Sequence, residues 1–436
     1  MLLLPYIVQN LLYLRGKIKE MEVFLMGNYD ERLKRVQDAI ELKEPDRVPI
    51  CTKLGIGPYI IDGCSNRDAM YGYARAIEAN VNFYKKFPML DADQHAAFTN
   101  GLGNELAGTT ILDWPGRPGT KVPDNSTYQV MEYEYMSEEE YPDVLHDYTG
   151  FMLQKYIPRA FPKLAGLSSI KFNPANLLSI SYMNGLFSDE ALEAYELLGK
   201  IAVSQKETNA ANAECSRQIA EMGFPPFYTG GGEVPFDVIG DYYRGTIPTL
   251  LDQLEHEEEM AEFCDRIADI EIASFQRFKG SNAPVKRVFF PMHKGMDGFM
   301  SAEQYENIYW KPFKKIINAL VDMDVTPYLY TEGKYNTRLE QLRDLPKGKC
   351  MIHFETVDMK KAKEIVGDNS CIVGNLSAYL LEMGTPEQVT EEVKKLLDIC
   401  MPGGGYIFDC NGSIDIAKEE NIDAMYNALL KYGSYK

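Results

Sequence analysis

The chain has 436 residues, of which 45% are hydrophobic and 25% charged, so a large core can be buried and extensive disorder is not expected. Its net charge of -19 argues against a nucleic-acid partner, because binding to phosphates needs clustered Lys and Arg. The eight cysteines form no CxxC pair and no dense framework, which is typical of reduced thiols and predicts a cytoplasmic protein.

The first 26 residues differ from the rest of the chain. They are apolar but have neither a basic leader nor a small-residue cleavage site, so they are not a secretory signal. Charged residues from Arg15 onward interrupt the run before the ~20 apolar residues that a membrane helix needs, and we expect no membrane contact. We hypothesise that translation starts at Met26, which makes residues 1–26 an extension outside the native protein.

The first half of the chain begins with regular elements and then becomes mixed. A helical pattern from residue 30 is stopped by Pro45 just before a first strand, DRVPICTKLG. Turn residues and alternating positions over 109–145 predict an excursion with short strands. Residues 186–222 predict a long helix that ends at Gly223 as a C-cap.

Five short apolar runs follow, each ending in polar or Gly residues and each followed by a helical pattern. They are VKRVFFPMHKG, VTPYLYTEG, KCMIHFETVD, SCIVGNLSA and GGYIFDCNG. Capping boxes predict two of the helix starts, at Ser301 with Gln304 and at Thr385 with Gln388. This alternation is typical of parallel strands covered by helices, either in a barrel or in a doubly wound sheet. No GxGxxG follows a strand, so we predict an α/β fold, a single (β/α)8 TIM barrel over 27–436 with extra helices and short strands inserted in the first half.

Polar side chains collect at the C-terminal ends of the predicted strands, where a barrel places its functional groups. His, Glu and Cys among them are all zinc ligands, and a catalytic zinc takes three protein ligands and leaves a position for substrate. The strand-end residues are His293, Lys294, Glu332, His353, Glu355, Asn375, Asp409 and Cys410.

The same residues also allow structural explanations. Either histidine can be a buried hydrogen-bonding group, and Cys410 can be a small core residue. We expect Glu332 to be buried, where a carboxylate needs a partner, and Lys294, Lys334 and Arg338 are the candidates for an ion pair.

Six stretches of the chain resemble a known family. They are RLKRVQDAIELKEPDRVPI, DWPGRPG, PFDVIGDYYRGT, HKGMDGFMSAEQYENIYWKPFKKIINAL, IVGNLSAYLLEMGTPEQV and GGYIFDCNGSIDIAKEENIDAM. From about residue 30 to its end the chain resembles the uroporphyrinogen decarboxylase superfamily, in the branch that includes corrinoid-linked methyltransferases. The resemblance implies one barrel with a deep cleft at its mouth. The founding decarboxylases carry an arginine-containing MRQAGR-type run after the first strand, whereas this chain has ICTKLGIGPYIIDG there, so the resemblance does not imply uroporphyrinogen decarboxylation.

The resemblance also implies a set of metal ligands. Methylcobamide:coenzyme M methyltransferases of this superfamily bind zinc through an H-x-C pair at one strand end and a Cys near the last strand. Over this chain the pair falls on Tyr330 and Glu332, and the last Cys falls at or beside Cys410. A Glu in place of a Cys favours zinc as a Lewis acid on an oxygen, such as that of a methyl ether. The implied ligands are His293, Glu332 and Cys410, with His353 as the alternative.

We therefore predict a zinc-dependent methyltransferase of the O-demethylase type. It would move a methyl group between a small methylated (methoxy-type) substrate and a corrinoid that a partner protein carries, since the chain contains no D-x-H-x-x-G corrinoid signature. The candidate catalytic residues are Glu332, Lys294 and Asp93. The candidate substrate-binding residues are Tyr330, Glu355, Asn375 and Asp91.

Two other hypotheses remain at this point. A metal-independent carboxy-lyase would use Asp91 or Asp93 near the barrel mouth to stabilise a protonated intermediate, although both also suit a loop turn. A corrinoid- or tetrapyrrole-binding protein would keep the barrel without turnover. Barrels of this type often pair, so a homodimer is a further expectation.

Overall fold

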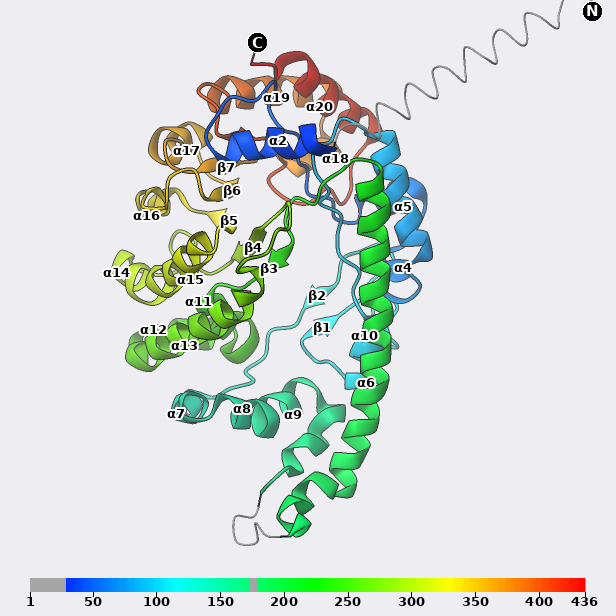
Figure 1. Ribbon diagram of the computed structural model, residues 1–436, viewed down its shortest axis with the longest axis vertical. Coiled ribbons are helices and arrows are strands. Elements are labelled where there is room, and N and C mark those ends of the chain that lie inside the picture. The colour runs from blue at the N-terminus through cyan, green and yellow to red at the C-terminus, as the bar shows by residue number, and fades with distance from the viewer. Residues whose placement is uncertain (1–28, 173–178, 436) are drawn as a thin grey trace, which may run out of the picture.

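The computed structural model describes residues 29–172 and 179–435. At its centre lies a sheet of six parallel strands in the order β3-β4-β5-β6-β7-β8, so that neighbours in the chain are neighbours in the sheet (Figure 1). The strands are β3 (Gly230–Gly231), β4 (Arg287–Met292), β5 (Thr326–Lys334), β6 (Met351–Thr356), β7 (Cys371–Val373) and β8 (Tyr406–Ile407). Strands β4 to β8 are the five runs predicted from the sequence.

Two extended segments from the first quarter of the chain close this sheet into a barrel. Single-residue bridges join Ile50 to Phe408 beside β8, and Asp93 to Pro226 just before β3. The two segments join each other where the Asp91 backbone N–H donates to the Ile50 carbonyl oxygen at 2.8 Å. The predicted TIM barrel is therefore confirmed, with its first two strands held by isolated bridges rather than by a continuous ladder.

Helices cover the outside of the barrel, and their starts follow the predicted signals. Both predicted capping boxes form, Ser301 with Gln304 and Thr385 with Gln388. The covering helices are α2 (Tyr29–Ile40), α11 (Pro235–Val238), α12 (Thr246–Glu255), α13 (Glu257–Phe275), α14 (Ala302–Gln304), α15 (Lys311–Asp322), α16 (Leu339–Arg343), α17 (Met359–Val366), α18 (Ala378–Met383), α19 (Pro386–Cys400) and α20 (Glu419–Tyr432).

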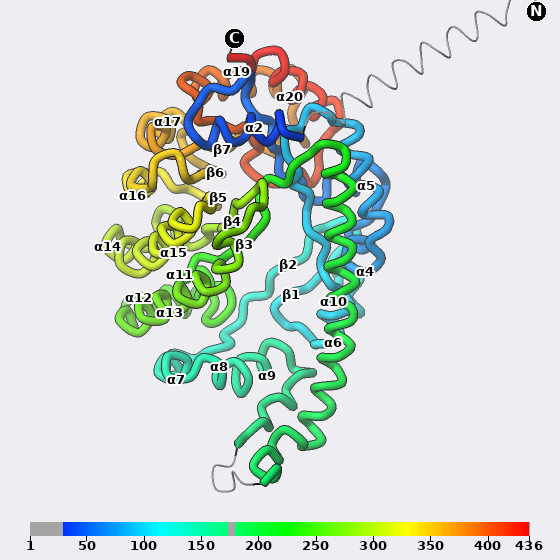
Figure 2. The backbone as a smooth tube through the Cα atoms, viewed as in Figure 1, coloured from blue at the N-terminus to red at the C-terminus, as the bar shows by residue number. Residues whose placement is uncertain are grey.

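The first half of the chain adds helices and short strands to the barrel, as predicted. These are α3 (Gly57–Asp62), α4 (Asn66–Tyr71), α5 (Ala74–Lys86), α6 (Gly101–Ala107), β1 (Leu112–Asp113), β2 (Gln129–Val130), α7 (Tyr141–His146), α8 (Tyr148–Phe151), α9 (Ile157–Ala160) and α10 (Asp189–Glu221). Strands β1 and β2 pair antiparallel within the predicted excursion. The long helix α10 packs against α5 and α6 and extends beyond the barrel (Figure 2).

Short 3-10 and π-helical segments connect these elements. They are η1 (Glu138–Glu140), η2 (Met152–Tyr156), η3 (Pro162–Ser169), η5 (Ile180–Phe187), η6 (Ile239–Arg244), η7 (Gln276–Phe278), η8 (Tyr305–Trp310) and η9 (Asn336–Arg338). Among the described residues, no helix has both the length and the apolar character to cross a bilayer. The predicted extension 1–26 and the hypothesised start at Met26 lie outside the described residues.

Candidate active site

The mouth of the barrel holds a charged cluster around His293, which follows β4. Its Nδ1 lies 2.6 Å from Asp241 Oδ2, and its Nε2 lies 3.5 Å from Glu332 Oε1 at the end of β5. Burial opposes a charge on this imidazole, but the hydrogen bonds with Asp241 and Glu332 outweigh it and raise the pKa of His293 to about 11. The ring is therefore a cation held between two carboxylates at neutral pH.

Lys294 is buried beneath the same cluster and pairs with the same carboxylate. Its Nζ forms an ion pair with Asp241 Oδ1, and Glu132 Oε1 lies 3.5 Å away. A Cβ on Gly240 would stand 2.4 Å from Lys294 Cδ, so this glycine leaves room for the Lys294 side chain in its present position. Lys294 thus pairs with Asp241 rather than with Glu332 or Glu355.

Asp237 anchors the backbone of this strand end. It accepts hydrogen bonds from the backbone N–H groups of His293 at 2.8 Å and Lys294 at 2.9 Å, and from the Tyr309 hydroxyl at 2.9 Å. Burial raises the pKa of Asp237 to about 6 and that of neighbouring Glu233 to about 7. The cluster can therefore hold protons near neutral pH as well as charges.

Sequence reasoning missed Asp237 and Asp241, although both stand in the quoted run PFDVIGDYYRGT. Their spacing of four residues places both carboxylates on one face of the α11–η6 segment, which packs against the end of β4. That spacing was the available signal. It did not say which strand end the helix would meet.

Glu332 differs from its prediction in one respect. It was expected to be a buried carboxylate, but its side chain is 43% exposed, and its only ion-pair partner among the described residues is His293. Lys334 and Arg338 do not pair with it, since Arg338 instead donates to the carbonyl oxygens of Gly295 and Met300. The exposed carboxylate oxygen is accessible from the barrel mouth.

Neither His353 nor Cys410 joins the His293–Glu332 pair. The His353 ring is fully buried, stacks on Tyr330 with 4.3 Å between centroids, and its Nε2 lies 2.8 Å from the Cys410 carbonyl oxygen. Burial lowers the pKa of His353 to about 3, so it is a neutral donor to that oxygen. The Cys410 thiol contacts Met425 Sδ of α20 at 3.9 Å, and burial raises its pKa well above the ordinary value.

Side-chain alternation along the strand explains the place of Cys410. Successive residues of a strand point to opposite faces, so Asp409 lies inside the barrel and Cys410 faces the surrounding helices. Asp409 Oδ1 accepts the backbone N–H groups of Lys53 and Cys410, and burial raises the pKa of Asp409 to about 7. The predicted ligand set His293, Glu332 and Cys410 is thus not assembled in this arrangement.

Two donors of the cluster nevertheless suit a metal ion. Metal-bound histidines usually donate their second ring N–H to a carboxylate, as His293 does to Asp241. The 3.5 Å between Nε2 and Glu332 Oε1 suits two ligands of one ion, since zinc lies about 2.0–2.2 Å from each such atom. The one group of three potential ligands that converge within the described residues lies elsewhere, at Glu138, Glu255 and His256 on the surface. His293 and Glu332 therefore fit two ligand positions of a metal ion, and the third protein ligand is unassigned.

Lys53, at the end of the first barrel segment, also belongs to the mouth. Its Nζ lies 3.9 Å from the centroid of the Tyr330 ring and 5.0 Å from that of Phe289. It lines a pocket of about 530 Å³ together with His95, Tyr128 and other residues of the first third of the chain, and with Tyr228, Ser413 and Asp415 from later parts of it. Sequence reasoning noted the lack of arginine in this run and missed its lysine.

The two aspartates predicted near the mouth have different places. Asp91 is fully buried at the start of its segment, where Arg35 and Arg47 each approach its carboxylate to 2.6 Å. Asp93 accepts hydrogen bonds from the Tyr84 hydroxyl and the backbone N–H of His95, and lies 2.8 Å from the His95 ring. Asp91 is therefore a structural ion-pair centre away from the mouth, which corrects its predicted substrate contact, while Asp93 supports a residue of the pocket wall.

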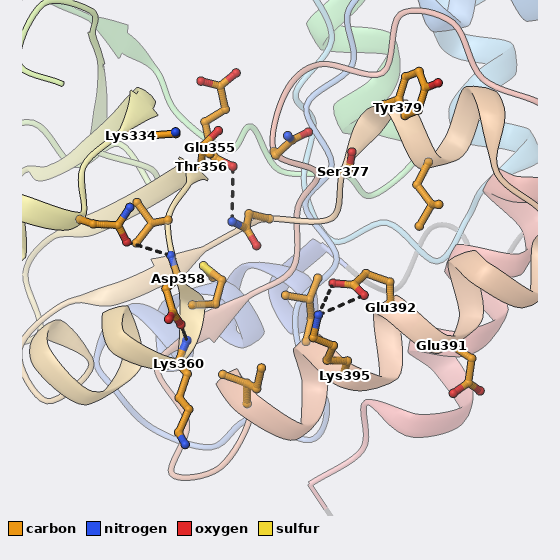
Figure 3. A pocket seen from close by; sticks show the side chains of 18 of the residues that line it. Lys334, Glu355, Thr356, Asp358, Lys360, Ser377, Tyr379, Glu391, Glu392 and Lys395 are labelled. Carbon is orange, nitrogen blue, oxygen red and sulfur yellow. Dashed lines mark hydrogen bonds and ion pairs between the residues drawn. The ribbon is translucent and has the colours of Figure 1, made fainter. Parts of the chain in front are cut away.

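Glu355 and Asn375 line a second, larger groove on the rim of the barrel. This groove of about 1080 Å³ lies between β6, α17, α18 and α19 (Figure 3). Glu355 Oε2 accepts the Gly333 backbone N–H, and the Asn375 side chain donates to the Glu355 carbonyl oxygen at 3.4 Å. Both predicted substrate-binding residues are thus half-buried at the rim, beside the His293–Glu332 pair rather than within it.

Comparisons with known proteins fit this arrangement. Residues 227–432 match the family model described as uroporphyrinogen decarboxylase (URO-D). The methylcobamide:CoM methyltransferase MtbA of Methanosarcina acetivorans is 31% identical over 135 residues, which are 30% of this chain and 38% of the relative. A methyltransferase from Methanosarcina mazei has a similar structure, with a TM-score of 0.57 over 92% of this chain and 98% of that one. At 15% identity this last match speaks for the fold alone.

The matched region carries the strand ends from Glu233 to Cys410, and the curated alignment spans less than half of the relative's length. Residues 227–432 are thus similar to the uroporphyrinogen decarboxylase family, and part of the chain is similar to a methylcobamide:CoM methyltransferase.

Proposed function

We propose that this protein transfers a methyl group between a small methylated substrate of the methoxy type and a corrinoid carried by a separate protein. The observation that carries the proposal is the His293–Glu332 pair, which lies at the barrel mouth within the region that matches the family. The similarity to a methylcobamide methyltransferase supports methyl transfer to or from a corrinoid as the reaction class.

This reaction requires the protein to stabilise the negative charge that develops on the leaving oxygen. When the reduced corrinoid cobalt takes the methyl group of an ether, the carbon–oxygen bond breaks and its electron pair stays on the oxygen. A positive group beside that oxygen lowers the barrier. His293 provides one, and its hydrogen bond with Asp241 fixes the direction in which Nε2 points.

Zinc is part of the proposal. His293 and Glu332 would hold it, and the ion would act as a Lewis acid on the substrate oxygen. Cys410 completes the set only if its thiol turns away from Met425. A proton and a metal ion compete for the same ring nitrogen, so metal binding would release the proton of His293 Nε2.

The carboxy-lyase alternative has less support. It needs a carboxylate free to stabilise a protonated intermediate, but two arginines already neutralise Asp91 and the Tyr84 hydroxyl and His95 engage Asp93.

The test uses free cob(I)alamin as the methyl acceptor. Purified protein incubated with zinc and a panel of methyl ethers, methylamines and methyl thiols should convert cob(I)alamin to methylcobalamin with at least one ether, followed by absorbance. Glu332→Gln and His293→Gln should lower this rate by about 100-fold, within the range for removing one charge-stabilising group. Glu364→Gln, on the exposed face of α17, is the matched control and should keep it. Absence of methylcobalamin with every donor, from folded and zinc-loaded protein, would refute the proposal.

A further inference from the structure

The pocket of about 530 Å³ near the His293–Glu332 pair, called the reaction pair below, contains a cation without a carboxylate partner, Lys53. Two basic residues line this pocket, Lys53 and His95. His95 is already paired, since its Nδ1 lies 2.8 Å from Asp93 Oδ1. No carboxylate of the described residues reaches ion-pair distance of Lys53 Nζ, which contacts only the faces of Tyr330 and Phe289.

The carboxylates nearest to Lys53 have other partners. Its backbone N–H, not its ammonium group, donates to Asp409 Oδ1, and Asp415 Oδ1 accepts the Ile56 backbone N–H. Glu332 attracts it most strongly but pairs with His293. A partly buried ammonium group that the chain leaves without a hydrogen-bonding anion is costly, and a bound anion removes that cost.

The shape and walls of the pocket indicate what kind of anion fits. Its volume lies in the range of small-molecule sites. Tyr128 and Tyr228 form apolar walls, and Tyr228 stacks on Phe289 with 5.2 Å between centroids. These flat faces suit a planar or apolar body rather than a highly charged one.

Lys53 also lies near the His293–Glu332 pair. The Tyr330 ring contacts the Lys53 ammonium group. Tyr330 comes two residues before Glu332 on β5, so about 7 Å of strand separates the two residues. Lys53 therefore lies within the length of a small molecule from the His293–Glu332 pair.

We infer that Lys53 anchors an anionic group of the substrate, so that the methyl donor is a small methyl ether with a carboxylate on an apolar or aromatic body. This inference rests on the proposed function for the identity of the methyl group. The anion site itself can be tested without turnover.

The test compares two probes of one body, 3-methoxybenzoate and methoxybenzene, by titration calorimetry. Wild-type protein should bind the acid at least about 10-fold more tightly than the uncharged ether, as a hydrogen bond to a charged group provides. Lys53→Met should lose this preference while binding methoxybenzene unchanged. Lys53→Arg should keep most of it, and Lys311→Met, an exposed lysine on α15, should keep all of it.

Two results would overturn the inference: wild-type protein that shows no preference for the acid or binds neither probe, and a Lys53→Met variant that keeps the preference. Melting temperatures of the variants show whether they fold, and Lys53→Arg guards against a fold defect at this position. A Lys53-dependent preference without any methyl transfer to cob(I)alamin would refute the proposed reaction and leave the anion site standing. Methyl transfer to cob(I)alamin without a preference for the acid would support the proposed reaction and refute the anion site.

Discussion

Replacing Asp241 by Asn tests the charge cluster most directly, because one carboxylate serves two cations. Asp241 Oδ2 lies 2.6 Å from His293 Nδ1, and Oδ1 pairs with Lys294, which is only 5% exposed. Asp241→Asn leaves buried Lys294 with only the more distant and more exposed Glu132 as a carboxylate partner. Such a loss costs about 3–5 kcal/mol in the free energy of unfolding.

The same change should alter the titration of His293. Its folded pKa of about 11 lies above the unfolded value of 6.5, so its ion-pair stabilisation is complete below about pH 6.5 and is lost as the pH rises towards 11. Without Asp241 the pKa falls, although Glu332 and Asp237 still attract the cation.

Urea unfolding at pH 7 and proton NMR of the ring measure the two effects. The chain has only five histidines, so a His293→Gln spectrum assigns the signal. Asp322→Asn, an exposed position on α15, is the matched control. A loss of less than about 1 kcal/mol, together with an unchanged His293 titration, would refute the reading of Asp241 as the shared counterion.

Three further predictions concern other residues of the barrel. Asp91→Asn should destabilise the fold by about 3–5 kcal/mol in urea while leaving the binding of 3-methoxybenzoate unchanged, because Asp91 pairs with two arginines away from the mouth; weakened binding in a folded variant would contradict this. Asp409 has a folded pKa of about 7, above its unfolded value of 3.8, so it lowers stability as the pH rises between these values. Unfolding of Asp409→Asn from pH 4 to 8 should therefore lose part of that slope, and an unchanged slope would show that Asp409 is not protonated. Cys410→Ala should retain zinc by metal analysis while His293→Gln and Glu332→Gln lose it, since the thiol faces Met425; loss of zinc from Cys410→Ala would restore Cys410 as the third ligand.

The sequence predicted the C-terminal two-thirds of the barrel well because its signals are local. Apolar strand runs, capping boxes at Ser301 and Thr385, and the buried face of α19 depend on residues only a few positions apart. The closing segments around Ile50 and Asp93 gave weaker signals, since isolated bridges and not a ladder hold them.

The candidate site was harder to predict because it depends on which elements meet. Reading strand ends found His293, Lys294 and Glu332, but not Asp241, which reaches them from the η6 segment some fifty residues earlier in the chain. A shift of one residue along a strand separates Asp409 in the barrel interior from Cys410 outside it, and no composition signal resolves that step. Asp91 and Asp93 likewise belong to one segment, but Asp91 lies away from the barrel mouth and Asp93 lies beside His95 of the pocket wall.

The His293–Glu332 pair and the pocket residues around Lys53 come largely from different regions of the chain. His293 and Glu332 lie within residues 227–432, the region shared with the decarboxylase family model, whereas Lys53, His95 and Tyr128 lie before it. A barrel can keep its reactive groups on some strands and change its selectivity through loops and insertions on others. The proposed reaction pair therefore lies in the region that matches the family model, whereas Lys53 and most of the lining of the proposed anion pocket lie before that region. Exchanging the first third of the chain with that of a relative should accordingly change which methyl donor binds, while the acceptor and the dependence of the rate on His293 stay the same.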